Sequence, residues 1–234
     1  MGDIHGAYKA LMQCLERSRF DYQNDTLIQL GDIVDGYKQS FECVDELLKI
    51  KNLIAIKGNH DDWFESFIDT DFHPDYWNFG GKATVSPYLK YAGKPVICFP
   101  SGSGFKTSLN SSDIPPEHRQ FFHKQRLFFI DNDQRCFVHG GFNRNIAFDQ
   151  QAQSMYYWDR QLWTDAIIHQ DRGLSQDIFD MVTKFKEIYI GHSSTTNWET
   201  DQPMTIMNII NLDTGAGHSG RLTIMDIETK QYWQ

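Results

Sequence analysis

The first 70 residues alternate helix-like segments with short apolar runs. Apolar residues recur at helical spacing over 11–18 and again over 40–50, which predicts two helices. The runs TLIQL (26–30) and LIAIK (53–57) each end next to a glycine and predict buried strands. Such an order is typical of parallel strands joined by crossover helices. In sheets of this kind, functional groups gather on the loops at the carboxyl ends of the strands.

The segment from about 70 to 125 is less regular and is interrupted by glycines and prolines. We expect helices and loops laid over the sheet, as a cap or a cleft wall. Its SGSG stretch (101–104) lacks the setting of a phosphate-binding loop, so a turn is favoured. Two roles are open for the aromatic residues here, a core under the cap or a platform that stacks on substrate, and the core is favoured. These residues are Trp63, Phe64, Phe67, Phe72, Tyr76, Trp77 and Phe79.

Beyond residue 126 the chain turns to apolar runs separated by short spacings and turn signals. We expect strands at 127–130, 135–139, 188–192, 207–213 and 221–227, largely in antiparallel pairs. No internal repeat or linker divides the sequence. The prediction is therefore one α/β domain over residues 1–234, with the 70–125 segment as an insertion.

Composition narrows the possible partners. Lys and Arg number 22 against 31 Asp and Glu, which gives a net charge of -9 and argues against nucleic acid or membrane binding. The four cysteines are scattered, as expected for reduced thiols rather than a disulfide framework. No apolar run reaches the length of a membrane span and no signal peptide is recognisable, so a cytoplasmic location is expected.

Candidate chemistry lies where the predicted strands end. Five motifs combine glycine with histidine or a carboxylate: GDIHG (2–6), GDIVD (31–35), GNHD (58–61), VHGG (138–141) and GHSS (191–194). Each alone could be an ordinary strand-to-helix turn. Together they provide imidazoles and carboxylates, which suit manganese, iron or zinc, and one carboxylate can bridge two ions.

These motifs resemble the signature of the calcineurin-like metallophosphoesterases, and most closely the bacterial and phage serine/threonine protein phosphatases of the bacteriophage lambda type. The resemblance covers nearly the whole chain. It implies a four-layer α/β/β/α sandwich of mixed sheets with two divalent metal ions between the loops, manganese being favoured and iron or zinc the alternatives. The ligands implied are Asp3 and His5 for the first ion, Asp32 as the bridge, and Asn59, His139 and His192 for the second.

The resemblance also implies a mechanism. A hydroxide that bridges the two ions would attack phosphorus in line, without a phospho-enzyme. His60 would protonate the leaving oxygen, while Asp35 holds the other ring nitrogen. The alternative for His60 is a structural histidine behind the ligands.

The phosphate-binding residues match the family less well. Gly36 stands where the family usually has arginine. Arg160, Arg144 and the ligand Asn59 are the candidate substrate contacts, and a surface charge is the alternative for both arginines. We expect a surface helix around His118 and a structural role for His218.

Three functions follow. The leading one is a metal-dependent phosphomonoesterase acting on phosphoserine or phosphothreonine of proteins. The second is a hydrolase of small phosphoesters or dinucleoside polyphosphates, like the symmetrical diadenosine tetraphosphatases. The third is a catalytically inactive binding protein.

The motif GDIHG stands at the very start of the sequence, where the resemblance implies a preceding buried strand. We therefore expect the first strand of the fold to be missing, Asp3 to lie on a frayed terminus, and a central strand position to be empty.

Overall fold

A computed structural model describes residues 1–102, 104–174 and 179–234; Ser103 of the predicted SGSG turn lies outside the described residues. The helices are α1 (Tyr8–Arg17), α2 (Ser40–Leu47), α3 (Asn59–Thr70), α4 (Gly81–Tyr91), α5 (Pro116–His123), α6 (Met155–Trp158) and α7 (Gln161–Asp171). The strands are β1 (Thr26–Gln29), β2 (Asn52–Ala55), β3 (Cys98–Ser101), β4 (Gly104–Thr107), β5 (Phe128–Ile130), β6 (Arg135–Val138), β7 (Glu187–Ile190), β8 (Met204–Ile206), β9 (Ile209–Asn211), β10 (Ile224–Met225) and β11 (Tyr232–Trp233). A short 3-10 helix, η1 (Asp75–Asn78), precedes α4.

The larger sheet has five strands in the order β5-β6-β7-β9-β8. Strands β1 and β2 are parallel and form a separate two-stranded sheet. β6, β7 and β9 are parallel, whereas β5 and β8 run antiparallel at the two edges. The expected antiparallel pairing is thus wrong for the centre of this sheet. The reason is that the long segment between β6 and β7 carries α6 and α7, a crossover that the short apolar runs do not reveal.

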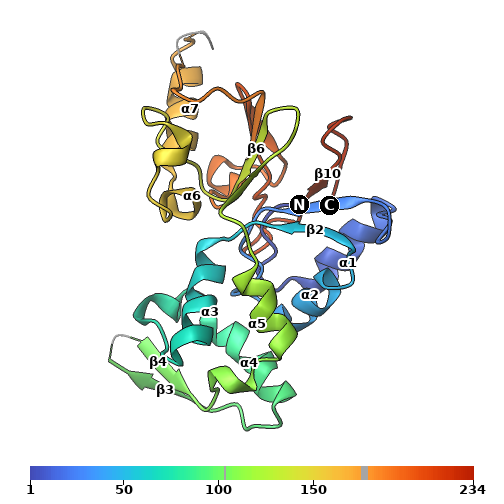
Figure 1. Cartoon of the computed structure of the whole chain (residues 1–234), viewed down its shortest axis with the longest axis vertical. Coiled ribbons are helices and arrows are strands. Elements are labelled where there is room, and N and C mark those ends of the chain that lie inside the picture. Colours follow the sequence, from blue (N-terminus) through green and yellow to red (C-terminus); the bar gives the residue numbers. More distant parts are fainter. Residues whose placement is uncertain (103, 175–178) are drawn as a thin grey trace.

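Three hydrophobic cores separate four layers, and α/β architecture with mixed sheets is confirmed. Side chains alternate along the central strands, because successive residues of a strand point to opposite faces. Ile188 and Ile190 face the core under α6 and α7, while Tyr189 faces the core between the sheets. The third core contains residues from each of the helices α1 to α5 and also Leu27 of β1. Figure 1 shows α6 and α7 beside the β6 sheet and α1, α2 and α3 beside β1 and β2.

The start of the chain is buried, and the expected frayed terminus is wrong. Met1 is 4% exposed and Asp3 is 2% exposed. The terminal amino group donates to the Ile28 carbonyl at 2.8 Å, and burial lowers its pKa to about 5. The Gly2 amide donates to Thr223, so this segment bridges β1 and the start of β10. The expectation of an empty strand position is also wrong, because Met1 and Gly2 occupy the place beside β1 and hydrogen-bond on both sides.

The segment from 70 to 125 forms η1, α4, the β3–β4 hairpin and α5, which pack against α2 and α3 (Figure 1). Of the SGSG stretch, Ser101 ends β3 and Gly104 begins β4. Of the aromatic residues expected in the core, Phe64, Phe67 and Trp77 are fully buried. Phe72 and Phe79, by contrast, are 60% and 69% exposed, so the core prediction is wrong for these two.

His118 was expected on a surface helix, yet it is fully buried. Its Nδ1 accepts the Tyr88 hydroxyl at 2.9 Å, and its Nε2 faces the Asp45 carboxylate at 2.9 Å. Its ring also lies 4.6 Å from that of Phe41. His118 therefore connects α5 to α2 and α4 inside the core formed by helices α1 to α5.

No helix among the described residues is long and apolar enough to cross a membrane.

The Tyr88–His118 hydrogen bond provides a test of this packing. We expect His118→Leu to lower the free energy of unfolding by about 1–3 kcal/mol, because the buried Tyr88 hydroxyl loses its acceptor. The double variant His118→Leu/Tyr88→Phe removes both polar partners and should recover part of the loss. Urea unfolding measures both variants. A single variant as stable as the natural chain would contradict the assignment.

Candidate metal centre

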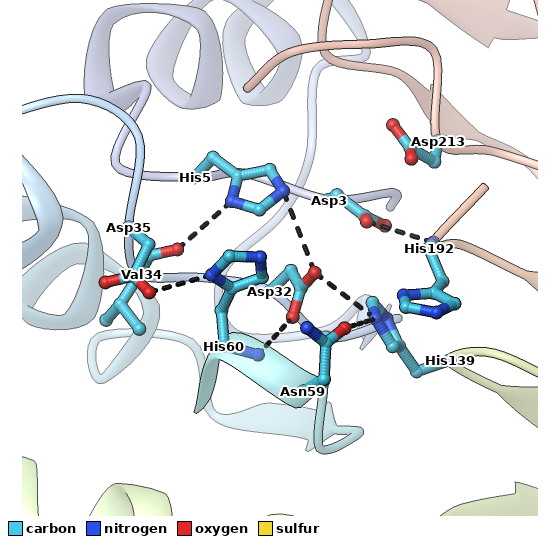
Figure 2. Close-up of polar contacts among 12 residues, drawn as sticks. Asp3, His5, Asp32, Val34, Asp35, Asn59, His60, His139, His192 and Asp213 are labelled. Carbon is cyan, nitrogen blue, oxygen red and sulfur yellow. Dashed lines mark hydrogen bonds and ion pairs between the residues drawn. The ribbon is translucent and has the colours of Figure 1, made fainter. Parts of the chain in front are cut away.

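The polar motifs lie at the carboxyl ends of parallel strands. Asp32 and Asp35 follow β1, and Asn59 opens α3 just beyond β2. His139 and His192 follow β6 and β7. Figure 2 shows these side chains gathered in one region together with Asp3, His5 and His60. The structure thus brings together the residues that the motifs predicted.

Asp32 stands at the centre of this group. Its Oδ2 lies 3.7 Å from His5 Nε2 and 3.3 Å from His139 Nε2. Its Oδ1 accepts the backbone amide of His60 at 3.0 Å. Two sets of possible metal ligands share this carboxylate, with ligand atoms within 4.8 Å of one another: His5, Asp32 and His60 in one, and Asp32, His139 and His192 in the other.

Backbone carbonyls orient two of the histidines. His139 Nδ1 donates to the Leu30 carbonyl at 2.7 Å, and His5 Nδ1 donates to the Val34 carbonyl at 3.2 Å. With the proton held on Nδ1, Nε2 of each ring carries a lone pair and points toward Asp32. This arrangement is the usual way in which proteins prepare histidine for metal binding.

Two buried polar atoms of this site have no hydrogen-bond partner within the part of the chain that the structure describes. Asp3 Oδ1 and His192 Nε2 are inaccessible to solvent and make no hydrogen bond among the described residues. The other Asp3 oxygen, Oδ2, accepts the His192 amide at 3.0 Å. Because an unpaired buried polar atom is costly, a cation bound beside these atoms would satisfy both. The donor set therefore fits divalent metal ions.

The pKa values of the buried carboxylates also favour a bound cation in this site. Burial, with Asp213 and Asp32 nearby, raises the pKa of Asp3 well above its usual range. Burial also opposes ionisation of Asp32, but His139 and His60 outweigh it and hold the pKa of Asp32 well below its usual value. The two carboxylates differ because Asp32 faces imidazoles, whereas Asp3 faces other carboxylates. Three buried carboxylates in one place require positive charge to stay ionised together.

The histidines are suited to act as neutral ligands. Burial lowers the pKa of His5 despite the nearby Asp32 carboxylate. Burial, His139 and Arg160 lower the pKa of His192 well below its usual value. Neutral imidazole is the form that binds metal.

Several site residues adopt the left-handed backbone region. His5, Asp32, Asp35 and His192 have φ values of 49°, 54°, 66° and 64°. This conformation is uncommon for residues other than glycine, and strain of this kind collects at functional sites. It turns each side chain away from the strand direction toward the shared centre.

His60 is held by a buried carboxylate. Its Nδ1 lies 2.7 Å from Asp35 Oδ2. Asp35 Oδ1 in turn accepts hydrogen bonds from Trp77 Nε1 at 3.0 Å and from the Thr84 hydroxyl at 2.6 Å. Burial opposes protonation of His60, but the carboxylates of Asp32 and Asp35 outweigh it and raise its pKa to about 9. The ring can therefore carry a proton near neutral pH.

The two candidate arginines lie in different places. Arg160 lines the cavity beside the site, and its guanidinium donates to the His192 carbonyl and to Ser193 Oγ. Arg144 does not line this cavity; it pairs with Asp165 of α7 and lies over the Phe179 ring. The structure thus does not bring Arg144 to the site, because the chain beyond His139 leads away toward α7.

Gly36 lies against His5 rather than in open space. Its φ is 96°, and an added Cβ would meet the Cβ and carbonyl oxygen of His5 at 3.0 Å. Any longer residue here would be strained and would press on His5.

Sequence reasoning missed two buried carboxylates. The Asp61 carboxylate accepts hydrogen bonds from the backbone amides of Ile33 and Gly58 and from the Gln125 side chain. It therefore connects the loop after β1 to α3. Asp213 follows β9 and lines the cavity. Asp61 is the last residue of the GNHD motif and Asp213 ends the strand predicted over 207–213, and these positions were the available signal. His218, expected to be structural, also lines the cavity, and its carbonyl accepts the Tyr37 hydroxyl at 2.9 Å.

Comparison with known proteins agrees with this geometry. Residues 1–202 match the family model of the calcineurin-like phosphoesterases. Serine/threonine-protein phosphatase 1 of Salmonella typhimurium is 26% identical over 97% of this chain and 90% of its own length. The symmetrical bis(5'-nucleosyl)-tetraphosphatase of Pasteurella multocida is 24% identical over 100% of this chain and 94% of its own. A crystal structure described as that of a diadenosine tetraphosphatase has a TM-score of 0.65 at 16% identity, covering 99% of this chain and 89% of that one.

Gly191 offers a test of the metal site that changes none of the proposed ligand residues themselves. A Cβ added here would overlap Asp3 Oδ1, so Gly191→Ala should displace that carboxylate. We expect manganese affinity to fall at least about tenfold, as for other changes that misplace a ligand. Calorimetric titration of the metal-free protein measures it. The control is Gly173→Ala, where nothing lies within 4 Å; its φ of 64° makes alanine strained there, but Gly173 does not line the cavity. An equal loss of manganese affinity in both variants would contradict the prediction.

Proposed function

Because the chain belongs to the calcineurin-like phosphoesterase family, we propose that this hydrolase is a metal-dependent phosphomonoesterase acting on phosphoserine or phosphothreonine of proteins. One observation carries the proposal. The Asp32 carboxylate is shared by two sets of ligand atoms at the ends of parallel strands. The protein-phosphatase relative, similar over 97% of the chain, supports the substrate class.

The ligands proposed for two divalent ions are Asp3, His5, Asp32, Asn59, His139 and His192, with manganese favoured. Bound ions would supply Lewis-acid activation of a water molecule and neutralise charge on the phosphoryl oxygens. The chain contributes the arrangement: the Asp32 carboxylate lies between the rings of His5 and His139, and backbone carbonyls hold both rings.

Arg160 and Asn59 are the proposed phosphate contacts. Both line a cavity of about 820 Å³ that also contains His5, Asp32, His60 and His192. The guanidinium of Arg160 is held against the His192 loop, which leaves its remaining N–H groups for phosphate oxygens.

His60 is the proposed general acid. Asp35 occupies Nδ1, so a proton on Nε2 can be donated to the leaving oxygen. Trp77 and Thr84 fix Asp35 and act through it as positioning residues.

A second candidate is hydrolysis of dinucleoside polyphosphates. The observation in its favour is the tetraphosphatase relative, similar over the entire chain at 24% identity. Against it stands the charge of the cavity: among the described residues that line it, Arg160 is the only lysine or arginine. A chain of phosphates needs more cationic contacts than one phosphate does.

Replacing His60 separates the general acid from a structural role. We expect His60→Gln to lower kcat on a phosphothreonine peptide by about a hundredfold or more, since the alkoxide must be protonated as it leaves. The loss on p-nitrophenyl phosphate should be much smaller, because p-nitrophenolate leaves without a proton. Steady-state kinetics with manganese measures both.

His123→Gln is the matched control, because His123 is an exposed histidine that pairs with Asp69 far from the cavity. Equal losses of His60→Gln on the two substrates would contradict the general-acid role and indicate a structural one.

A substrate panel tests the substrate class. With manganese, the chain should hydrolyse a phosphothreonine peptide with a higher kcat/KM than diadenosine tetraphosphate, and chelation with EDTA should abolish both activities. A strong preference for the dinucleotide would sink the protein-phosphatase proposal in favour of the second candidate.

A further inference from the structure

One wall of the cavity consists of aromatic rings that no step above uses. Trp63, Phe79 and Trp158 all line it. Phe79 is 69% exposed and Trp158 is 43% exposed, although both are large and apolar. Exposed aromatic residues grouped beside a polar site are typical of ligand-binding surfaces.

The three rings form a continuous strip. The Trp63 ring lies 6.5 Å from that of Phe79, nearly parallel to it, and 5.5 Å from that of Trp158. These residues come from α3, from the segment after η1, and from the end of α6. Elements far apart in the sequence therefore place three aromatic faces around one opening.

This strip begins at the proposed general acid. The ring of Trp63 lies 4.8 Å from that of His60, edge to face. On the other side, the ring of Trp158 lies 6.0 Å from that of His192. If His60 is the general acid proposed above, a leaving group that receives its proton lies beside Trp63, the ring of the strip that contacts His60. Phe79 continues the strip from Trp63.

The size and charge of the cavity limit what can occupy this side. Its volume of about 820 Å³ exceeds what a phosphate group fills. Beyond Arg160, the described lining residues provide no lysine or arginine for further phosphates. Flat apolar groups stack favourably on tryptophan and phenylalanine faces.

We propose that Trp63, Phe79 and Trp158 form a subsite for a flat aromatic ring on the leaving group of the substrate. The subsite rests on the phosphomonoesterase function proposed above and adds a preference to it. The ring has two possible sources, an aromatic group close to the ester oxygen or the base of a mononucleotide, and stacking is the shared chemistry.

Matched substrates test the proposal. Benzyl phosphate and cyclohexylmethyl phosphate are similar in size and in leaving-group chemistry but differ in aromaticity. Adenosine 5'-monophosphate and ribose 5-phosphate differ by the base. We expect the natural chain with manganese to favour the aromatic member of at least one pair by about fivefold in kcat/KM. The pair that shows the preference identifies the source of the ring.

The double variant Phe79→Leu/Trp158→Leu removes two rings but keeps apolar side chains, and it should reduce this preference to about twofold or less. The matched control is Phe72→Leu/Phe99→Leu, which changes two exposed aromatic residues outside the cavity and should keep the preference. A preference absent from both pairs of substrates, or retained by the first variant, overturns the subsite.

Failure of the function itself gives a different result. If no phosphoester is hydrolysed with manganese, the phosphomonoesterase proposal falls. The subsite is then judged by calorimetric binding of benzylphosphonate against cyclohexylmethylphosphonate. The subsite is supported if the natural chain binds the aromatic phosphonate more tightly and Phe79→Leu/Trp158→Leu abolishes this difference in affinity. Equal affinity of the natural chain for the two phosphonates overturns the subsite.

Discussion

The site depends on one carboxylate that must serve two halves of the molecule. Asp32 follows β1, and its side chain reaches His5 near the start of the chain and His139 beyond β6. Its backbone carbonyl also accepts the amides of Ile4 and His5. Without Asp32, no carboxylate would lie between the ring of His5 and the ring of His139. The position of this residue thus decides whether the layers can meet around metal ions.

Neighbouring residues stabilise Asp32 and Asp35, whose burial and backbone conformation are unfavourable by themselves. Burial disfavours ionised carboxylates, and left-handed backbone at Asp32 and Asp35 is strained. Asp61 offsets part of this cost by binding the amides of the loop after β1. Trp77 and Thr84, from the segment over the sheet, bind Asp35. The segment from 70 to 125 therefore holds the Asp35 carboxylate that faces His60, and it also supplies Phe79 to the cavity wall.

Much of the fold and site could be predicted from motifs. The strand ends carried the imidazoles and carboxylates, so the proposed ligand set could be named before any distance was known. Errors arose where long-range packing decides. Arg144 follows His139 closely in sequence, yet the chain turns away and pairs it with Asp165. His118 has a polar side chain on an amphipathic helix, yet Tyr88 and Asp45 satisfy both its ring nitrogens, so it can be buried.

The sequence by itself determined the alternation of strands and helices, the family, and the residues able to bind metal, because these follow from local patterns and short motifs. Tertiary structure alone decided that β6, β7 and β9 are parallel and that Met1 is buried. It also decided that Trp63, Phe79 and Trp158 share one wall beside His60. Such features join segments far apart in the chain, and no local pattern specifies which segments meet.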